Sequence, residues 1–400
     1  MSDIAQVGSR ASVHRGSVAV ARPYTRSVLH VFSYFRPDFT GEGLYLEKIA
    51  SHLAALGVRS TVIAARTAPR TATSSSHYPN ALGTPKLFGQ DKAAISLPML
   101  AWLALHAREY DVVHFHASVE RYFLCHAIAR LSGCRVVQSA TLDDGLGTLI
   151  DGYRGAYRWA VRRLVRLIDT AVAISPKLYQ DTLTVMPRDR VSLIPQGVAL
   201  PDADPAARMQ ARHRWGYTPD DVVLLFVGGM CARKDVRFLV DHLPPCPQGA
   251  TLRLLLVGPE LDDAYPRALR AAIAASPAAA RITVEGYMDD PAPAYRAADA
   301  FVFASRQEGF GNVLLEAMAF GLPVVCRRLP GVTDDFIDDG TTGLLFDTPG
   351  DFRDHVLRLA ADSALRRSIG SAARRRVALC YDLRTVAGQY VAVYDGAASP

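Results

Sequence analysis

One stretch, residues 300–326, constrains the fold more than any other part of the chain. Residues 300–304 and 323–326 are short apolar runs that predict buried strands, and residues 313–320 between them are apolar at helical spacing. A strand, a turn, a helix and a second strand, in this order, form the repeating unit of a parallel α/β sheet. We therefore expect a parallel α/β sheet.

The turn before this helix carries groups that suit an anionic ligand. Gly309 and Gly311 allow a close backbone approach, and Asn312 is a predicted N-cap that leaves free N–H groups at the positive end of the helix. Glu308 lies in the turn, where its carboxylate can face a pocket. Glu316 lies about one turn into the helix, where it reaches a ribose or faces solvent. The alternative is an ordinary helix start with two solvated glutamates.

The spacing of these residues resembles that of a known family. The pattern Glu-x7-Glu around Gly-Phe-Gly, followed by Glu-Ala-Met-Ala-x-Gly-x-Pro-Val-Val, resembles the signature of family 4 retaining glycosyltransferases, which have the two-domain GT-B fold. The resemblance implies that Glu308 contacts the donor sugar and that Glu316 binds the nucleotide ribose. It also implies that the turn faces the donor through Gly309, Phe310, Gly311, Asn312 and Val313.

The length of the chain fits two domains, because 400 residues exceed what a single core usually organises. We expect residues 1–26 to be a disordered extension and residues 27–200 to form an acceptor-side Rossmann-like domain. Residues 201–380 are expected to form a nucleotide-sugar-binding Rossmann-like domain that faces the first across an interdomain cleft. Residues 381–400 are expected to form a helix that returns to the first domain.

Cysteine usage and apolar run lengths predict a cytoplasmic protein. The six cysteines are scattered without a CxxC pair, which argues against a zinc site or a disulfide framework. The most apolar long run, residues 93–107, is shorter than the roughly 20 residues that span a bilayer. Residues 1–26 contain arginines but no apolar segment of the kind found in a secretory signal.

The net charge of +6 is unevenly placed. Residues 1–200 contain 23 Lys and Arg and 14 Asp and Glu, which gives a net charge of +9. Subtracting these counts from the totals of 45 and 39 leaves 22 basic and 25 acidic residues in residues 201–400, a net charge of −3. No nucleic-acid-binding motif accompanies this charge, so an anionic inner leaflet, contacted peripherally, fits better than nucleic acid. Residues 157–168 predict a helix with a basic face, formed by Arg158, Arg162, Arg163 and Arg166. This face either docks on anionic lipid or is simply solvated.

Two further patterns lie in the first half. Gly41 and Gly43 follow the predicted strand 27–32 and resemble the glycine loop of GT-B enzymes that faces the cleft, although a plain turn needs the same residues. His114 and His116 end the predicted strand 110–116. A metal site would require a third ligand and a nearby carboxylate, and the alternative is histidines that line the cleft or bond to backbone. The family needs no divalent metal, so we expect none, and no cofactor.

The strand at residues 135–140 is followed by a departure from the family. Many members place a histidine near the donor sugar at this point, whereas this chain has Asp143 and Asp144. Carboxylates at the carboxyl edge of a parallel sheet can orient an acceptor hydroxyl or take its proton. They can equally cap the next helix.

The second half opens with a candidate phosphate clamp. A buried strand leads into Gly229, Arg233 and Lys234, and cations beside a glycine turn neutralise a nucleotide diphosphate. Lys234 matches the lysine of the family pattern Gly-Arg-Leu-x3-Lys-Gly, while Gly229 stands where the arginine often is and Asp235 where glycine usually is. Arg233 is the candidate replacement. The base-facing candidates that the resemblance implies are Tyr287 and Met288.

The sequence thus predicts transfer of a sugar, with retention, from a nucleotide-diphosphate sugar to a glycan or lipid-linked acceptor in bacterial surface polysaccharide biosynthesis. The alternatives are a GT-B epimerase, a phosphorylase, or a nucleotide-sugar-binding subunit without activity. The epimerase would bind the same donor without an acceptor.

Overall fold

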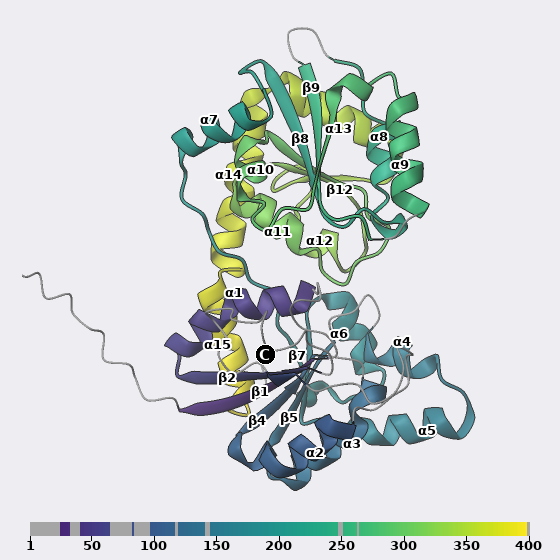
Figure 1. Ribbon diagram of the computed structural model, residues 1–400, viewed down its shortest axis with the longest axis vertical. Coiled ribbons are helices and arrows are strands. Elements are labelled where there is room, and N and C mark those ends of the chain that lie inside the picture. The colour runs from purple at the N-terminus through teal and green to yellow at the C-terminus, as the bar shows by residue number, and fades with distance from the viewer. Residues whose placement is uncertain are drawn as a thin grey trace, which may run out of the picture.

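The computed structural model describes residues 25–32, 41–64, 82–83, 97–116, 119–140, 145–246, 251–261 and 264–397. Two α/β domains lie one above the other along the long axis of the molecule (Figure 1). Most of the predicted extension, residues 1–24, lies outside the described residues. Its last residue was assigned wrongly, because Arg26 begins β1 and its guanidinium bonds to Asp395 at 2.5 Å.

The first domain is built on a parallel sheet, in which the described residues form seven strands in the order β3-β2-β1-β4-β5-β6-β7. The strands are β1 (Arg26–Phe32), β2 (Val58–Ala64), β3 (Leu82–Gly83), β4 (Val112–Phe115), β5 (Arg135–Ala140), β6 (Thr170–Ala173) and β7 (Val191–Leu193). The helices between them are α1 (Gly41–Ala55), α2 (Leu97–His106), α3 (Val119–Leu131), α4 (Leu146–Asp151), α5 (Gly155–Leu164) and α6 (Pro176–Leu183).

The second domain is built on a parallel sheet of six described strands in the order β10-β9-β8-β11-β12-β13. The strands are β8 (Asp221–Val227), β9 (Thr251–Val257), β10 (Ile282–Gly286), β11 (Ala300–Phe303), β12 (Val324–Arg327) and β13 (Leu344–Phe346). The helices are α7 (Pro205–Arg214), α8 (Val236–Asp241), α9 (Ala264–Ala275), α10 (Ala292–Ala297), α11 (Asn312–Ala319), α12 (Thr333–Phe336), α13 (Pro349–Ala361) and α14 (Ser363–Cys380).

Both sheets have the strand order of a doubly wound fold, so the predicted fold class is confirmed. In each sheet the order reverses at one point, between β1 and β4 in the first and between β8 and β11 in the second. In such folds ligands bind outside the carboxyl ends of the strands at this switch point. The groups that follow β1, β4, β8 and β11 are therefore the first to consider as a site.

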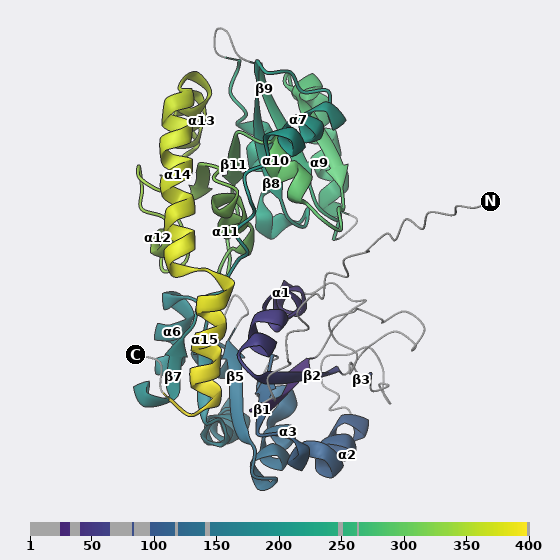
Figure 2. The ribbon, with the colours of Figure 1, turned by 90° about the vertical axis from the view of Figure 1, so that its left-hand side faces the viewer.

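The last helix, α15 (Leu383–Tyr394), returns to the first domain and packs beside α1 (Figure 2). Its apolar face joins a buried cluster with α1 and the first sheet through Leu383, Val386, Ala387, Tyr390, Val393 and Tyr394. Among the helices that the structure describes, none combines the length and the apolar character needed to cross a bilayer.

The two chain segments that connect the domains lie side by side. The N–H of Val198, on the way out of the first domain, donates to the carbonyl of Tyr381, on the way back, at 2.8 Å. Arg374, in α14, donates to the carbonyl of Pro201 at 2.6 Å. The two connections thus hold each other through backbone and side-chain hydrogen bonds.

Candidate functional site

The switch point of the second sheet brings Lys234 and Glu308 together, although 74 residues separate them in sequence. Lys234 follows β8 and Glu308 follows β11, and these strands are neighbours. The ammonium of Lys234 lies 2.6 Å from Oε1 of Glu308, and the guanidinium of Arg233 lies 3.0 Å from Oε2. Ser305 donates to the same Oε1 at 2.7 Å. Glu308 is buried, and both of its carboxylate oxygens are engaged.

The backbone beside this cluster has an unusual conformation at Asp235. Its φ of 48° places it in the left-handed region, and among the described residues it is the one non-glycine with positive φ. Glycine takes this conformation without the steric cost that a side chain brings. In this chain the Asp235 carboxylate bonds to Arg306 at 2.8 Å and Arg327 at 3.3 Å. Those ion pairs oppose the cost of the strained backbone.

The start of α11 differs from the sequence prediction. Asn312 was expected to be the N-cap, but it is the first helical residue and Gly311 is the cap, without a side-chain hydrogen bond. The reason is the φ of 104° at Gly311, which turns the chain into the helix one residue earlier than a capping side chain would. The helix start therefore offers backbone N–H groups, as expected, but no capping amide.

Glu316 joins the two domains. Its Oε1 lies 2.5 Å from the ammonium of Lys48, which is on α1 of the first domain, and its Oε2 accepts from the hydroxyl of Tyr295 at 2.8 Å. Burial raises the pKa of Tyr295 well above its usual range, and the charge of Glu316 raises it further. Tyr295 is therefore a permanent donor to this carboxylate. Figure 1 shows α1 on the side of the first domain that faces α11 and α12.

The space beside Gly229 explains one departure from the family pattern. A Cβ built on Gly229 would lie 2.3 Å from Cδ1 of Leu261. Leu261 therefore occupies the volume into which a side chain at position 229 would begin. Arg233 instead supplies a second cation to Glu308, and its guanidinium also donates to the carbonyl of Gln307 at 2.7 Å.

The other residues predicted to bind the nucleotide-sugar donor differ in whether the side chain or only the backbone can reach a ligand. The side chain of Phe310 is buried in the core against Phe336, with ring centroids 5.6 Å apart, so only its backbone can face a ligand. Met288 and Val313 also pack against that core. Tyr287 is 54% exposed, just after β10. Gly309 lies in the turn between Glu308 and Phe310.

The predicted first-domain residues are only partly described. Asp143 and Asp144 lie outside the described residues. The expected glycine loop before the first helix was placed too late in the chain, because α1 begins at Gly41 and Gly43 lies in its first turn. A role of these glycines in donor binding stays a prediction.

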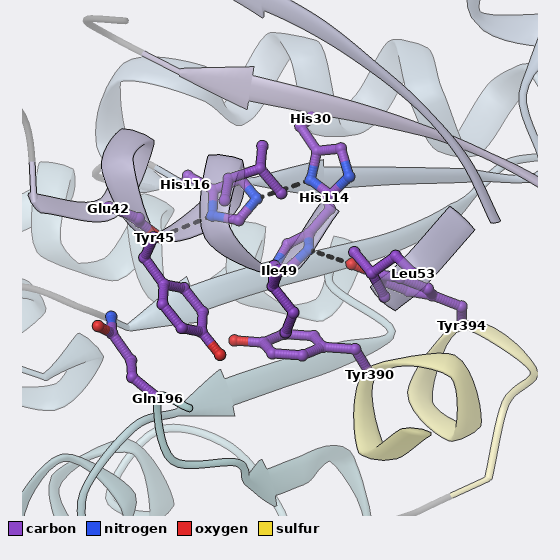
Figure 3. A pocket seen from close by; sticks show the side chains of 11 residues that line it. His30, Glu42, Tyr45, Ile49, Leu53, His114, His116, Gln196, Tyr390 and Tyr394 are labelled. Atoms are coloured by element: carbon purple, nitrogen blue, oxygen red, sulfur yellow. Dashed lines mark hydrogen bonds and ion pairs between the residues drawn. The ribbon is translucent and has the colours of Figure 1, made fainter. Parts of the chain in front are cut away.

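The switch point of the first sheet gathers three histidines, His30, His114 and His116 (Figure 3). Nδ1 of His30 lies 3.0 Å from Nε2 of His116, and Nδ1 of His116 lies 2.7 Å from Glu42 of α1. His114 bonds to Tyr394 at 3.0 Å and to Ser139 at 2.8 Å. Burial lowers the pKa values of His30 and His114 well below their usual range, and the neighbouring imidazoles lower them further.

Sequence reasoning missed residues in both clusters and around Glu316. Ser305 directly follows β11, so its place at the carboxyl edge of the sheet could have marked it. His30 lies in β1 opposite His114 in the parallel register, which only the strand pairing reveals. Lys48 and Tyr295 carry no motif, and their approach to Glu316 depends on the tertiary structure.

Two family profiles match the chain in succession. The profile described as Glycosyltransferase Family 4 matches residues 39–200, and the profile described as Glycosyl transferases group 1 matches residues 221–362. The sulfoquinovosyl transferase SQD2 of Arabidopsis thaliana is 29% identical over 66% of this chain and 52% of its own length. The chain spans about half the length of the first curated relatives it matches, at 52%, 48% and 46%.

Solved structures share the fold at lower identity. Anabaena HepE, crystallised with UDP and glucose, is 20% identical with a TM-score of 0.76, and the match covers 93% of this chain and 100% of that one. WaaG, described as a glycosyltransferase involved in lipopolysaccharide biosynthesis, is 19% identical with a TM-score of 0.71, covering 92% and 100%. Both likenesses show the GT-B fold. Because the two profiles match in order along both halves of the chain, this protein belongs to the glycosyltransferases that they describe, Glycosyltransferase Family 4 and Glycosyl transferases group 1.

Proposed function

We propose that this protein is a retaining glycosyltransferase that moves a sugar from a nucleotide-diphosphate sugar to a glycan or lipid-linked acceptor in bacterial surface polysaccharide biosynthesis. The observation that carries the proposal is the convergence of Lys234, Arg233 and Glu308 beside the start of α11. This cluster sits at the switch point of a doubly wound sheet, where such folds bind nucleotides.

The chemistry of the cluster suits a departing diphosphate. As the bond from sugar to phosphate breaks, negative charge grows on the phosphate, and positioned cations stabilise that charge more in the transition state than in the ground state. Lys234 and Arg233 are oriented by Glu308 before the donor arrives. The N–H groups at the start of α11 add a positive dipole end on the same side.

The ion pairs of Glu308 fit a reaction that retains the configuration of the sugar without an enzymic nucleophile. A carboxylate that attacks the anomeric carbon needs a free oxygen, yet both oxygens of Glu308 are bonded to cations. We infer a front-face reaction, in which the leaving phosphate takes the proton from the incoming hydroxyl. In this mechanism Glu308 contacts the donor sugar and positions Lys234, and no metal is required.

The substrates are proposed by analogy with the relatives. HepE was crystallised with UDP and glucose, which supports a nucleotide sugar as donor for this chain. WaaG acts in lipopolysaccharide biosynthesis, which supports a surface glycan or a lipid-linked acceptor.

The test begins with a thermal-shift screen of the full chain against UDP- and GDP-sugars. A donor at 100 times its dissociation constant is expected to add about 2.7 kcal/mol to the free energy of unfolding. The donor that stabilises the chain is then incubated with it, and release of the nucleotide diphosphate is followed over time.

Slow hydrolysis of the bound donor, with the anomeric configuration of the released sugar retained, supports the proposal. Stabilisation without any release would instead identify a nucleotide-sugar-binding subunit without transferase activity. A new sugar nucleotide in place of free nucleotide would identify an epimerase.

We further propose that the protein is cytoplasmic and binds the inner face of the plasma membrane peripherally through α5. Trp159 is 60% exposed on this helix, and the guanidinium of Arg163 stacks over its ring at 4.2 Å. Arg158 and Arg162 both pair with Asp151, their guanidinium nitrogens lying 2.6 Å and 3.7 Å from its Oδ1. An exposed aromatic ring among arginines suits an anionic interface, where each basic residue adds on the order of 1 kcal/mol.

Flotation with anionic liposomes checks the membrane proposal. Binding is expected at low salt and is expected to fall at 1 M salt, because the screening length shrinks from about 8 Å at physiological ionic strength to about 3 Å. Replacing the α5 arginines with glutamine should abolish flotation in the variant Arg158→Gln, Arg162→Gln, Arg163→Gln. A control variant removes the same charge from the second domain: Arg353→Gln, Arg367→Gln, Arg375→Gln.

The control variant should float like the wild-type protein. Binding that is equal on neutral and anionic vesicles, or that both variants lose equally, would contradict docking through α5. The glycosyltransferase proposal does not depend on this result, because it rests on Lys234 and Glu308.

A further inference from the structure

The three histidines of the first domain are placed like the ligands of a single metal ion. His30, His114 and His116 each offer one ring nitrogen, and these three atoms lie within 4.8 Å of one another. His30 and His114 are fully buried, and the side chain of His116 is only 7% exposed. Imidazole nitrogen is a preferred ligand of Zn²⁺, and a set of three histidines is known in zinc sites.

The sheet itself produces this arrangement. His30 in β1 lies opposite His114 in β4 in the parallel register. His116 follows His114 by two positions, and side chains two apart along an extended strand point to the same face. The ligands therefore come from β1, from β4 and from the residue that directly follows β4, and the pairing of the two strands holds them together without any ion.

Each imidazole also has a partner of the kind that orients a metal ligand. His116 bonds to the Glu42 carboxylate through Nδ1 at 2.7 Å, so its Nε2, which lies 3.0 Å from Nδ1 of His30, is the nitrogen that can bind an ion. His30 bonds to Ser60 through Nε2 at 3.2 Å, which leaves Nδ1. His114 has a hydroxyl partner at each ring nitrogen, so either can turn to an ion while the other stays bonded. A carboxylate or hydroxyl behind each histidine is typical of metal sites.

The distance between the His30 and His116 nitrogens fits one shared ion, and the small space beside them excludes a larger ligand. Nδ1 of His30 and Nε2 of His116 are 3.0 Å apart. Two nitrogens on one tetrahedral Zn²⁺, each about 2.05 Å from the ion, lie about 3.3 Å apart, so a shift of a few tenths of an ångström suffices. The adjoining cavity is about 10 Å³, lined by α1, α15 and the histidines (Figure 3). It holds about one water molecule.

We propose that His30, His114 and His116 bind one divalent transition-metal ion, best matched by Zn²⁺, with three protein ligands and water in the fourth position. The ion takes the place of the proton between Nδ1 of His30 and Nε2 of His116. That proton moves to Nε2 of His30, which then donates to the Ser60 hydroxyl, so that binding releases no net proton.

The ion would connect four elements of the first domain. His30 and His114 belong to β1 and β4, Glu42 begins α1, and Tyr394 ends α15. Fixing these partners would hold α1, which carries Lys48 toward the second domain, in one position on the sheet. The site is separate from the donor groups around Lys234, so sugar transfer without a catalytic metal is unaffected by this proposal.

The test uses the tag-free full chain, stripped with a chelator and titrated with Zn²⁺ by calorimetry, and with Co²⁺ as a visible probe. We expect one ion per chain, the absorption of a tetrahedral nitrogen-ligated Co²⁺, and a melting temperature that rises with Zn²⁺ concentration. His116→Asn and His30→Asn should each weaken binding by roughly 100-fold or more. Glu42→Gln, which keeps the ligands, should weaken it by roughly 10-fold.

His126→Asn is the matched control, because His126 is a buried histidine of the same domain that pairs with Gln138 at 3.0 Å. It should bind Zn²⁺ like the wild-type chain. The proposal is overturned if the wild-type chain takes up neither ion at micromolar concentration, which would make the cluster a hydrogen-bonded network only. It is also overturned if His116→Asn and Glu42→Gln bind as tightly as wild type, which would locate the ion elsewhere.

Discussion

Lys234→Ala is expected to lower kcat for sugar transfer by about 100- to 1,000-fold, the usual effect of removing one charge-stabilising donor. Lys234 is 13% exposed and 2.6 Å from Glu308, so its ammonium is held in place before the donor binds. The charge it stabilises grows only as the bond breaks. The donor dissociation constant should therefore change much less than kcat, as measured by steady-state kinetics and calorimetry side by side.

Arg233→Ala is the matched comparison. Arg233 pairs with the other oxygen of Glu308 at 3.0 Å but is 38% exposed, so water screens its charge more strongly. We expect a smaller loss of kcat than for Lys234→Ala. A normal rate in Arg233→Ala would limit its role to positioning the turn, and a normal rate in Lys234→Ala would remove the phosphate clamp altogether. Melting curves of both variants check that each is folded.

Glu316→Ala is expected to weaken binding of the nucleotide diphosphate by roughly 1.5–3 kcal/mol, which is roughly 10- to 150-fold in the dissociation constant. The reason is loss of a charged acceptor for a ribose hydroxyl. The carboxylate is already oriented by Tyr295 at 2.8 Å, so little side-chain freedom is lost when the nucleotide binds. Calorimetric titration with UDP and GDP measures the effect.

Lys48→Ala separates this role from the contact between domains. Lys48 is 51% exposed, so its ion pair with Glu316 contributes only about 0–1 kcal/mol. The variant keeps the Glu316 carboxylate and is expected to bind the nucleotide as tightly as wild type or slightly more tightly. If Lys48→Ala loses as much affinity as Glu316→Ala, the ion pair and not a ribose contact governs binding. If neither variant loses affinity, Glu316 is structural.

The fold was predictable because both halves repeat one local pattern, a buried strand followed by an amphipathic helix. Apolar strand runs alternate with helical spacing from β1 to β13, and the strands either side of α11 were expected within a residue or two of where they occur. The pairing of Lys234 with Glu308 follows from the same pattern, because Lys234 comes after β8, Glu308 comes after β11, and these two strands are neighbours.

The rest depended on backbone geometry and on contacts distant in sequence. The family pattern marked Asp235 as a departure, but only its φ of 48° explains why glycine suits that position. Asparagine preference favoured Asn312 as the cap, and the left-handed Gly311 overrode it. Lys48 reaches Glu316 across 268 residues, a distance over which no local pattern carries information.

The first domain is built from two separate segments of the chain, because α15 returns to it. Its sheet comes from residues 26–193, but one face is covered by a helix from residues 383–394. The buried leucine and valine side chains of that helix each contribute roughly 1.5–3 kcal/mol when removed from water. A fragment that ends at residue 200 would leave that face exposed, whereas residues 201–380 contain all strands of the second sheet that the structure describes. During synthesis, the domain that leaves the ribosome first is therefore the last to be completed.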